Sequence, residues 1–173
     1  MNDSIFSERI EYRPISVADT DMLLKWRNSK NVVNNFIYRK EVTRSDHLNW
    51  LNNKVMTGEV IQFILVERIT RRAFGSVYLR DINSCEKSAE YGIFIGEEDM
   101  LGKGYGSETA KRIVDYFFNE MGYKYLKLRV LKKNEAAIKS YINAGFVADY
   151  NSEEEIDIEG IKYDLIFMYI NKP

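Results

Sequence analysis

The sequence predicts one domain of the α/β class, more narrowly α+β, with a central mixed, mostly antiparallel twisted sheet of about six to seven strands and about four flanking helices. The first observation is the order of the hydrophobic patterns, which run β-αα-βββ-α-β-α-ββ along the chain. The second is the short link between the first two strands of the central group, which is typical of antiparallel neighbours. The third is size, because 173 residues, 45% of them hydrophobic, bury one core and no Pro- or Gly-rich linker divides them. Residues 1–173 are therefore read as a single domain.

The charge balance and the cysteine content limit the classes of partner. The 25 basic and 26 acidic residues give a net charge of −1, which provides no general attraction to nucleic acid or to a membrane surface. The single cysteine, Cys85, permits no internal disulfide, and residues 1–4 are polar and precede no apolar run of signal-peptide length. We therefore expect a cytoplasmic protein that acts on a small molecule, without nucleic acid or a membrane as a partner.

The first strand and the first helix are predicted by a change of hydrophobic period. Residues Arg9–Arg13 alternate between polar and apolar side chains, and the alternation stops at Pro14. Asp19 or Thr20 then provides an N-cap. The apolar residues of the helix that follows are Met22, Leu23, Leu24 and Trp26.

A polar, Asn-rich stretch over 28–35 leads to a second helix, for which Thr43 or Ser45 is the expected cap. Its apolar face carries Leu48, Leu51 and Val55. Three strands follow at Val60–Glu67, Ala73–Leu79 and Ser88–Ile95. The link over 68–72 is short enough for a hairpin, so the central strands are expected to form an antiparallel meander.

The second half of the chain begins with a helical period of 3.6 residues. One helical face holds Ala110, Ile113, Val114, Phe117, Phe118 and Met121. Gly122 stands where a glycine would end that helix. A strand over Tyr125–Val130, a helix between Asn134 and Gly145, and two strands joined near residues 159–160 complete the prediction.

The most informative motif is the run Leu101–Ser107, directly before the third long helix. Its glycines at alternate positions let a backbone approach a ligand closely, and the helix N-terminus adds the positive end of its dipole. This arrangement predicts an anion cradle, although such a run also occurs as a flexible turn. A Walker A loop, a dinucleotide-binding unit and a protein kinase do not fit the spacing, the late position or the missing companion motifs.

A second motif, Asn134–Phe146, lies about thirty residues further on. Asn134 and Tyr141 are seven residues apart and return to nearly the same face of a helix, at roughly 100° per residue. The two motifs together resemble the acetyl-CoA site of the GCN5-related N-acetyltransferase (GNAT) superfamily. The predicted order of elements is that of this family over nearly the whole chain.

The resemblance implies a binding site for acetyl-CoA as co-substrate and implies no metal. Carried over position by position, the cofactor-binding residues are Phe94, Ile95, Leu101, Gly102, Lys103, Gly104, Tyr105, Gly106, Ser107, Asn134, Ala137 and Tyr141. One position departs from the family pattern, because Leu101 stands where the family usually has Arg or Gln. Lys103 is the residue that could supply the missing positive charge. In the family fold, the strand that corresponds to the one with Phe94 and Ile95 separates from its neighbour. This separation leaves backbone N–H groups free to bind the thioester.

The family also implies the catalytic groups. Tyr141 would protonate the leaving thiolate of CoA, a role suited to a phenol with an ordinary pKa near 10. The amine acceptor must lose a proton before it attacks, and the candidate bases are Glu90, His47 or a water chain. Each residue also has a simpler reading: Tyr141 as a core residue, Glu90 as a solvated side chain, and His47 as a structural or surface residue.

Acceptor recognition is assigned to the first half of the chain. Its substrate-binding candidates are Trp26, Arg27, Asn28, Tyr38, His47 and Trp50. This region resembles the helix pair of aminosugar acetyltransferases of the pseudaminic-acid type, and ribosomal-protein N-terminal and diamine acetyltransferases share a looser form of it. A nucleotide-linked 4-amino sugar is thus the expected acceptor, with a protein N-terminus or a polyamine as alternatives. The polyamine alternative draws on the acidic run 153–155, which is also readable as a solvated face.

Two further alternatives concern the role of this helix pair and of the whole chain. The helix pair is also readable as ordinary packing, with Trp26 and Trp50 as core anchors. A non-catalytic CoA-binding sensor or interaction module would share the fold without turnover. A spare strand at the edge of the sheet makes a homodimer the expected assembly.

Overall fold

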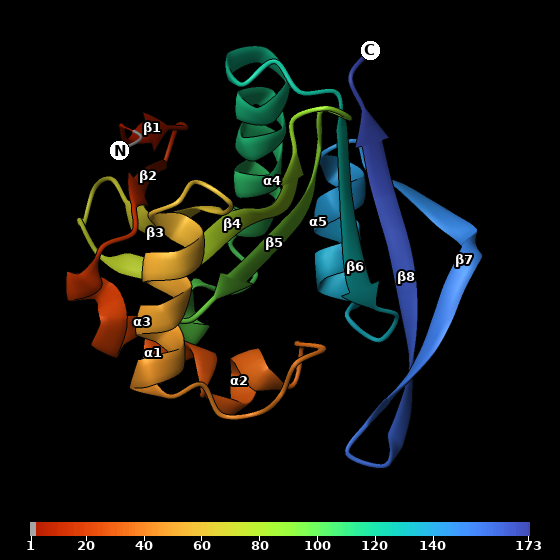
Figure 1. Cartoon of the computed structure of the whole chain (residues 1–173), viewed down its shortest axis with the longest axis horizontal. Helices are drawn as coiled ribbons and strands as arrows, with labels where there is room; N and C mark the ends of the chain where they lie inside the picture. Colours follow the sequence, from red (N-terminus) through yellow and green to blue (C-terminus); the bar gives the residue numbers. More distant parts are fainter. Residues whose placement is uncertain (1–2) are drawn as a thin grey trace.

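A computed structural model describes residues 3–173, with the side chains of Asn151 and Glu153 excepted. One eight-stranded sheet runs through the described chain in the order β1-β2-β3-β4-β5-β6-β8-β7 (Figure 1). The strands are β1 (Ile5–Phe6), β2 (Ile10–Pro14), β3 (Ile61–Glu67), β4 (Ala73–Asn83), β5 (Ser88–Ile95), β6 (Tyr125–Leu131), β7 (Val147–Ile158) and β8 (Ile161–Asn171). All neighbours are antiparallel except β5 and β6, which are parallel.

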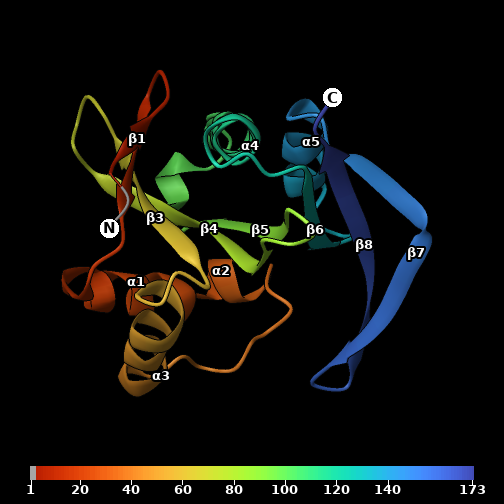
Figure 2. The ribbon, with the colours of Figure 1, turned by 45° about the horizontal axis from the view of Figure 1, so that its top comes forward.

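Helices cover both faces of the sheet. The α-helices are α1 (Thr20–Arg27), α2 (Lys30–Val33), α3 (Arg44–Trp50), α4 (Tyr105–Asp115) and α5 (Glu135–Asn143). Figure 2 shows α1, α2 and α3 on one face and α4 and α5 on the other. Short 3₁₀ turns precede α1 and α4, at Val17–Asp19 and Glu98–Met100. Single π-helical turns extend α3 over Leu51–Val55 and α4 over Tyr116–Glu120. Within residues 3–173 no helix is long and apolar enough to cross a membrane.

The predicted fold class is confirmed, and the structure adds two short elements and extends β4 beyond its predicted end at Leu79 to Asn83. The order of the seven longer strands and of α1, α3, α4 and α5 is the predicted one. The additional strand β1 has two residues, and the additional helix α2 has four. Neither is long enough to show a hydrophobic period, and α2 begins in the polar stretch where Ser29 accepts a hydrogen bond from the N–H of Val32.

The core is divided by the sheet into two main layers. The larger cluster fills the side of α4 and α5 and includes Phe63, Val77, Ile113 and Phe117. The smaller one lies against α1 and α2 and consists of Leu23, Trp26, Val32, Ile64, Val66 and Phe94. Neighbouring residues of β3 thus enter opposite layers, which explains why this strand reads as a continuous apolar run rather than as an alternation.

The parallel pair in the middle of the sheet separates along its length. Strands β5 and β6 pair only over Ser88–Glu90 with Tyr125–Lys127. Beyond Glu90, β5 continues to pair with β4, while β6 continues to pair with β8. The half of β5 from Tyr91 to Ile95 therefore has no strand on its β6 side among the described residues. This opening positions the site described next.

Candidate active site

A cavity of about 960 Å³ lies at the opening between β5 and β6. Its walls come from helices on both faces of the sheet, from the second half of β5, and from the glycine loop before α4. A cavity of this size in the centre of a sheet is typical of a ligand site. The predicted residues that line it are Arg27, Tyr38, His47, Trp50, Glu90, Phe94, Ile95, Leu101, Gly102, Gly104, Tyr105, Gly106, Ser107, Asn134, Ala137 and Tyr141.

The glycine loop has the backbone conformation of an anion cradle. Gly102 and Gly104 adopt φ values of 71° and 84°, which side chains with a Cβ rarely adopt, and α4 begins directly after them. A Cβ added to Gly102 would meet nothing within 4 Å, so the space beside the loop is open. The first N–H groups of α4 have no carbonyl partner within the helix. Together these features fit a pyrophosphate.

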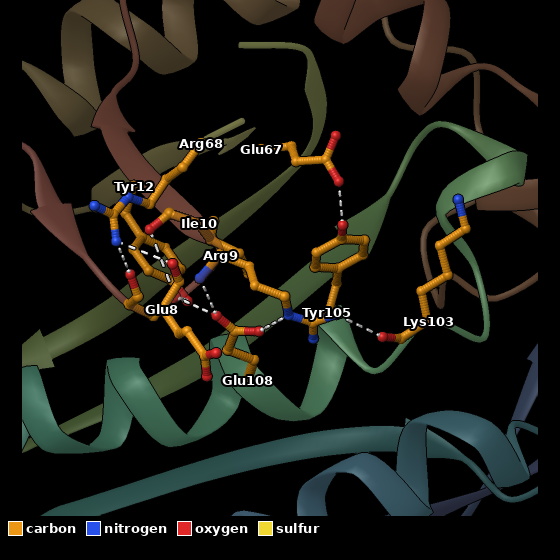
Figure 3. Close-up of polar contacts among 10 residues, drawn as sticks. Glu8, Arg9, Ile10, Tyr12, Glu67, Arg68, Lys103, Tyr105 and Glu108 are labelled. Carbon is orange, nitrogen blue, oxygen red and sulfur yellow. Dashed lines mark hydrogen bonds and ion pairs between the residues drawn. The ribbon is translucent and has the colours of Figure 1, made fainter. Parts of the chain in front are cut away.

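Arg9 holds the glycine loop from the N-terminal segment, as Figure 3 shows. Its Nη1 donates to the carbonyl of Lys103 over 3.0 Å, and its Nε forms an ion pair of 2.7 Å with Glu108 in the first turn of α4. The guanidinium carbon lies 4.4 Å from the centroid of the Tyr105 ring. Arg9 thus joins the loop, the helix and the aromatic residue between them, a contact that sequence reasoning missed because 94 residues separate Arg9 from Lys103.

Tyr105 fixes the start of α4 through a second contact drawn in Figure 3. Its hydroxyl hydrogen-bonds to the carboxylate of Glu67 at the end of β3, and this contact raises the pKa of Tyr105. Its ring is buried and packs 4.8 Å from the ring of Phe74. Lys103 does not line the cavity, and its Nζ lies 3.9 Å from the sulfur of Met100. The expectation that Lys103 supplies a positive charge to the cradle is therefore not supported, because its side chain does not reach the cavity wall.

The motif on α5 places Asn134 and Tyr141 on the cavity wall together. The Oδ1 of Asn134 accepts the N–H of Ala137 over 3.2 Å, so this residue caps α5 as predicted. Tyr141 is buried, and its ring lies about 6 Å from the rings of Tyr91 and Phe146. Burial raises the pKa of Tyr141. Tyr141 is thus both a core residue and a cavity residue, so the two interpretations of it are compatible.

His47 is buried at the cavity wall on α3. Burial lowers its pKa, the nearby Asp19 opposes this shift, and Arg44 adds to it. Its Nε2 is buried without a hydrogen-bond partner. The imidazole is therefore poised to stay neutral, which is the state that accepts a proton.

Glu90 also lines the cavity, but its carboxylate is already engaged. Its Oε1 accepts from Arg80 over 2.5 Å and from Arg129 over 3.4 Å. Neither arginine was singled out from the sequence, because they lie on β4 and β6, and only the sheet brings them to Glu90 on β5. A carboxylate bound by two guanidinium groups is stabilised in its charged form. To act as a base, Glu90 would have to accept a proton while it is held by both arginines.

The acceptor candidates from the first half divide into two groups. Arg27, Tyr38, His47 and Trp50 line the cavity, and the indole N–H of Trp50 donates to Gln62 over 2.8 Å. Trp26 and Asn28 do not line it. The Trp26 ring is buried, with its N–H donated to Glu97 over 2.8 Å, and Asn28 holds the backbone of Val42. Their positions support packing roles, so the expectation that both contact the acceptor is not supported.

The acidic run of β7 lies outside the cavity wall. Glu154 and Glu155 are exposed, and Glu155 pairs with Lys162 over 2.6 Å, while the side chain of Glu153 lies outside the described part. Within residues 3–173 no group of three or more His, Cys, Asp or Glu side chains is arranged to hold a metal ion.

Comparisons with known proteins agree with this geometry. The family model "Acetyltransferase (GNAT) domain" matches residues 9–147. The chain is 27% identical to spermidine N(1)-acetyltransferase of Vibrio cholerae over 95% of this chain and 94% of that protein. It is 24% identical to acetyltransferase PseH of Campylobacter jejuni over 75% and 78% of the two chains.

The fold is also that of a solved structure, the spermidine N-acetyltransferase from Vibrio cholerae in complex with CoA and spermine. The two superimpose with a TM-score of 0.86 at 24% identity, over 95% of this chain and 96% of the other. The glycine loop before α4, the separation of β5 from β6 and the family match lead to one conclusion: the chain belongs to the GNAT acetyltransferase family and is an N-acetyltransferase of that type.

Proposed function

We propose that this protein transfers the acetyl group of acetyl-CoA to a primary amine of a small molecule by direct attack, with Tyr141 as the general acid. The observation that carries the proposal is a single cavity that the glycine loop, the free half of β5 and Tyr141 all line. One ligand can therefore touch all three. The pyrophosphate end, the thioester and the leaving sulfur of acetyl-CoA need these three environments in that order.

The residues present fit CoA along the cavity. Gly102, Gly104 and the start of α4 would hold the pyrophosphate, with Arg9 keeping the loop in place from behind. Asn134 and Ala137 on α5 would flank the pantetheine arm. The free half of β5 would provide backbone N–H groups to the thioester carbonyl, whose oxygen gains negative charge as the amine adds.

Tyr141 serves the last step of the transfer. The neutral amine attacks the carbonyl carbon, the bond between that carbon and sulfur breaks, and the phenol of Tyr141 gives its proton to the thiolate. The proton lost by the attacking nitrogen restores the phenol through solvent, so the products are an amide and free CoA thiol. Because burial raises the pKa of Tyr141, the phenol keeps its proton at neutral pH until the thiolate of CoA forms and accepts it.

His47 is the first choice for the base. It is buried at the wall with a lowered pKa and an unpartnered Nε2, whereas Glu90 is tied to Arg80 and Arg129. A neutral imidazole accepts, directly or through water, the proton that the acceptor's ammonium group must lose before the neutral amine can attack. Glu90 and a water chain stay as the alternatives, and the pH dependence of turnover separates them.

For the acceptor, the relatives make polyamines the first compounds to test. The Vibrio cholerae relative is named for spermidine, while the aminosugar alternative has the support of PseH. The test is a panel of spermidine, nucleotide-linked amino sugars and N-terminal peptides, read by the release of CoA thiol from acetyl-CoA. Thiol release that needs both an amine and intact Tyr141 supports the proposal. Absence of release with every primary amine, while CoA still stabilises the protein, would refute it.

A further inference from the structure

Arg27, the last residue of α1, is a partly buried cation on the cavity wall. Its guanidinium carbon lies 3.8 Å from the centroid of the Phe36 ring, and burial lowers its pKa. Its Nη1 is buried without a hydrogen-bond partner, and no carboxylate in the described chain forms an ion pair with it. A cation withdrawn from water without a counter-charge is costly, so a ligand that brings the counter-charge would be favoured.

Unsatisfied polar atoms of the described chain gather around the same cavity. The buried side-chain atoms without a hydrogen-bond partner that belong to cavity-lining residues are Arg27 Nη1, His47 Nε2, Arg80 Nε and Tyr91 Oη. Arg80 Nε lies 3.6 Å from a carboxylate oxygen of Asp81, beyond hydrogen-bond distance. The two guanidinium nitrogens can only donate, and the phenol can donate as well, so a ligand that accepts hydrogen bonds would satisfy three of these four atoms.

Each carboxylate of the cavity wall already accepts hydrogen bonds at one of its oxygens. The acidic residues that line it are Asp46 and Glu90. Asp46 accepts from the N–H and the hydroxyl of Thr43 as part of the cap of α3, over 2.9 and 2.6 Å. Glu90 is bound by Arg80 and Arg129. The wall thus carries these two carboxylates against four cationic side chains, those of Arg27, Arg80, Arg129 and Lys139, and this charge balance favours an anionic group over a polycation.

The position of Arg27 separates it from the glycine loop. Helix α1 lies on the face of the sheet opposite to α4 and α5, as Figure 2 shows, while the glycine loop leads into α4. The cavity joins the two faces through the opening between β5 and β6. The phosphates of CoA, held at α4, would thus lie on one side, and Arg27 would face the molecule on the other side.

We propose that the acceptor amine carries an anionic oxygen group, a phosphate or a carboxylate, and that Arg27 binds this group and selects the acceptor. The proposal rests on the acetyltransferase function proposed above. It predicts that an anionic amine is a better acceptor than spermidine, for which a relative is named. The guanidinium, stacked on Phe36, presents a planar pair of donors that suits either anion.

The test compares matched acceptors on wild type and Arg27→Gln. Glucosamine 6-phosphate against glucosamine tests the phosphate, and 4-aminobutyrate against butylamine tests the carboxylate, with a nucleotide-linked amino sugar and spermidine alongside. We expect the better anionic acceptor to exceed its uncharged partner, and Arg27→Gln to lower its kcat/KM roughly ten- to hundredfold, mainly through KM. Arg27→Lys should recover part of this loss. The KM for acetyl-CoA should stay within about twofold, which separates acceptor binding from CoA binding.

Lys25→Gln is the matched control, because Lys25 lies on the same helix, is exposed, and does not line the cavity. It should leave all of these constants unchanged. The proposal is overturned if spermidine is used better than every anionic amine, or if Arg27→Gln leaves kcat/KM for the best anionic acceptor unchanged.

A binding measurement decides the proposal even without turnover. With CoA saturating, inorganic pyrophosphate should raise the Tm of wild type and leave that of Arg27→Gln unchanged. An equal effect, or none, on both proteins overturns the anion site. Thiol release with no amine at all, combined with a pyrophosphate shift that depends on Arg27, would refute the proposed function and leave the anion site standing.

Discussion

At the scale of single residues, burial shifts the pKa values of two titratable groups of the site in opposite directions. Burial raises the pKa of Tyr141, so its phenol stays protonated and can donate a proton. Burial lowers the pKa of His47, so its imidazole stays neutral and can accept one. The same physical cause therefore prepares a donor and an acceptor of protons in one cavity. Sequence reasoning selected both residues, but it could not determine their burial, which depends on elements far apart along the chain.

Replacing Tyr141 by Phe removes the hydroxyl and keeps the ring that packs near Tyr91 and Phe146. We expect kcat to fall by about 10² to 10⁴, the usual contribution of a positioned acid, while the stabilisation by CoA is retained. Steady-state thiol release and a CoA titration of Tm measure the two effects. Full turnover by this variant would remove Tyr141 from the mechanism.

His47 is the one histidine of the chain, so it provides a clean pH signature. Its folded pKa lies below the unfolded value of about 6.5, so the unfolded state binds more protons between these two pH values. The free energy of unfolding is thus at its full value above about pH 6.5 and falls as the pH drops through this window. Urea unfolding at pH 7.5 and pH 5.5 measures it.

In His47→Gln the loss of stability across that window should be absent. The paired carboxylates have lowered pKa values, as Asp19 has, and lose their contribution only in a more acidic range. If His47 is also the base, the acidic limb of kcat/KM should disappear in the same variant. Identical pH profiles of stability in the two proteins would contradict the assignment of a buried neutral imidazole.

At the scale of elements, the glycine loop acts as a unit because other segments hold it. Its carbonyl at Lys103 is bound by Arg9, and the helix behind it is tied to β3 through Tyr105 and Glu67 (Figure 3). The loop itself was readable from the sequence, since its glycines are local. The anchors were not, because the contacts that Arg9 and β3 make with the loop and with α4 have no signature in any one of these segments.

Gly104→Val tests the loop conformation. A β-branched residue at φ 84° is strained by about 1–3 kcal/mol, and relief of that strain would deform the cradle. We expect the rise of Tm produced by CoA to be lost. The matched control is Gly58→Val, because Gly58 has a φ of 80° with open space around it and does not line the cavity.

The Gly58 variant should lose comparable stability and keep the CoA-induced rise of Tm. Equal behaviour of the two valine variants in CoA binding would contradict the cradle.

Arg9→Ala tests the contact between the N-terminal segment and the loop. It removes the hydrogen bond to Lys103 and the ion pair with Glu108, and the loop should gain freedom that CoA binding must then suppress. Because Arg9 is partly exposed, the expected rise of the KM for acetyl-CoA is modest, roughly three- to tenfold. Arg68→Ala is the control, since Arg68 binds the carbonyls of Ser7 and Glu8 without touching the loop.

An unchanged KM in the Arg9 variant, or an equal rise in the Arg68 variant, would show that the loop is fixed without Arg9. Initial velocities over a range of acetyl-CoA concentrations distinguish these outcomes.

At the scale of the whole molecule, the order of elements was predictable and the distribution of charge in the cavity was not. Periodicity is local, so β3 to β8 and the four longer helices could be located from it. Arg80 and Arg129 meet Glu90 only after three strands have been brought side by side. Sheet edges are formed by β1 and β7 in the described chain, and the homodimer expected from a spare edge stays a prediction.

The opening between β5 and β6 has a kinetic consequence. Because the cavity is lined from both faces of the sheet, acetyl-CoA and the amine would approach the thioester from opposite sides and occupy the protein together. Transfer would then take place within a ternary complex, without an acetylated side chain between two half-reactions. The lines of double-reciprocal plots at several amine concentrations should intersect. Parallel lines would instead indicate a covalent acetyl-enzyme intermediate.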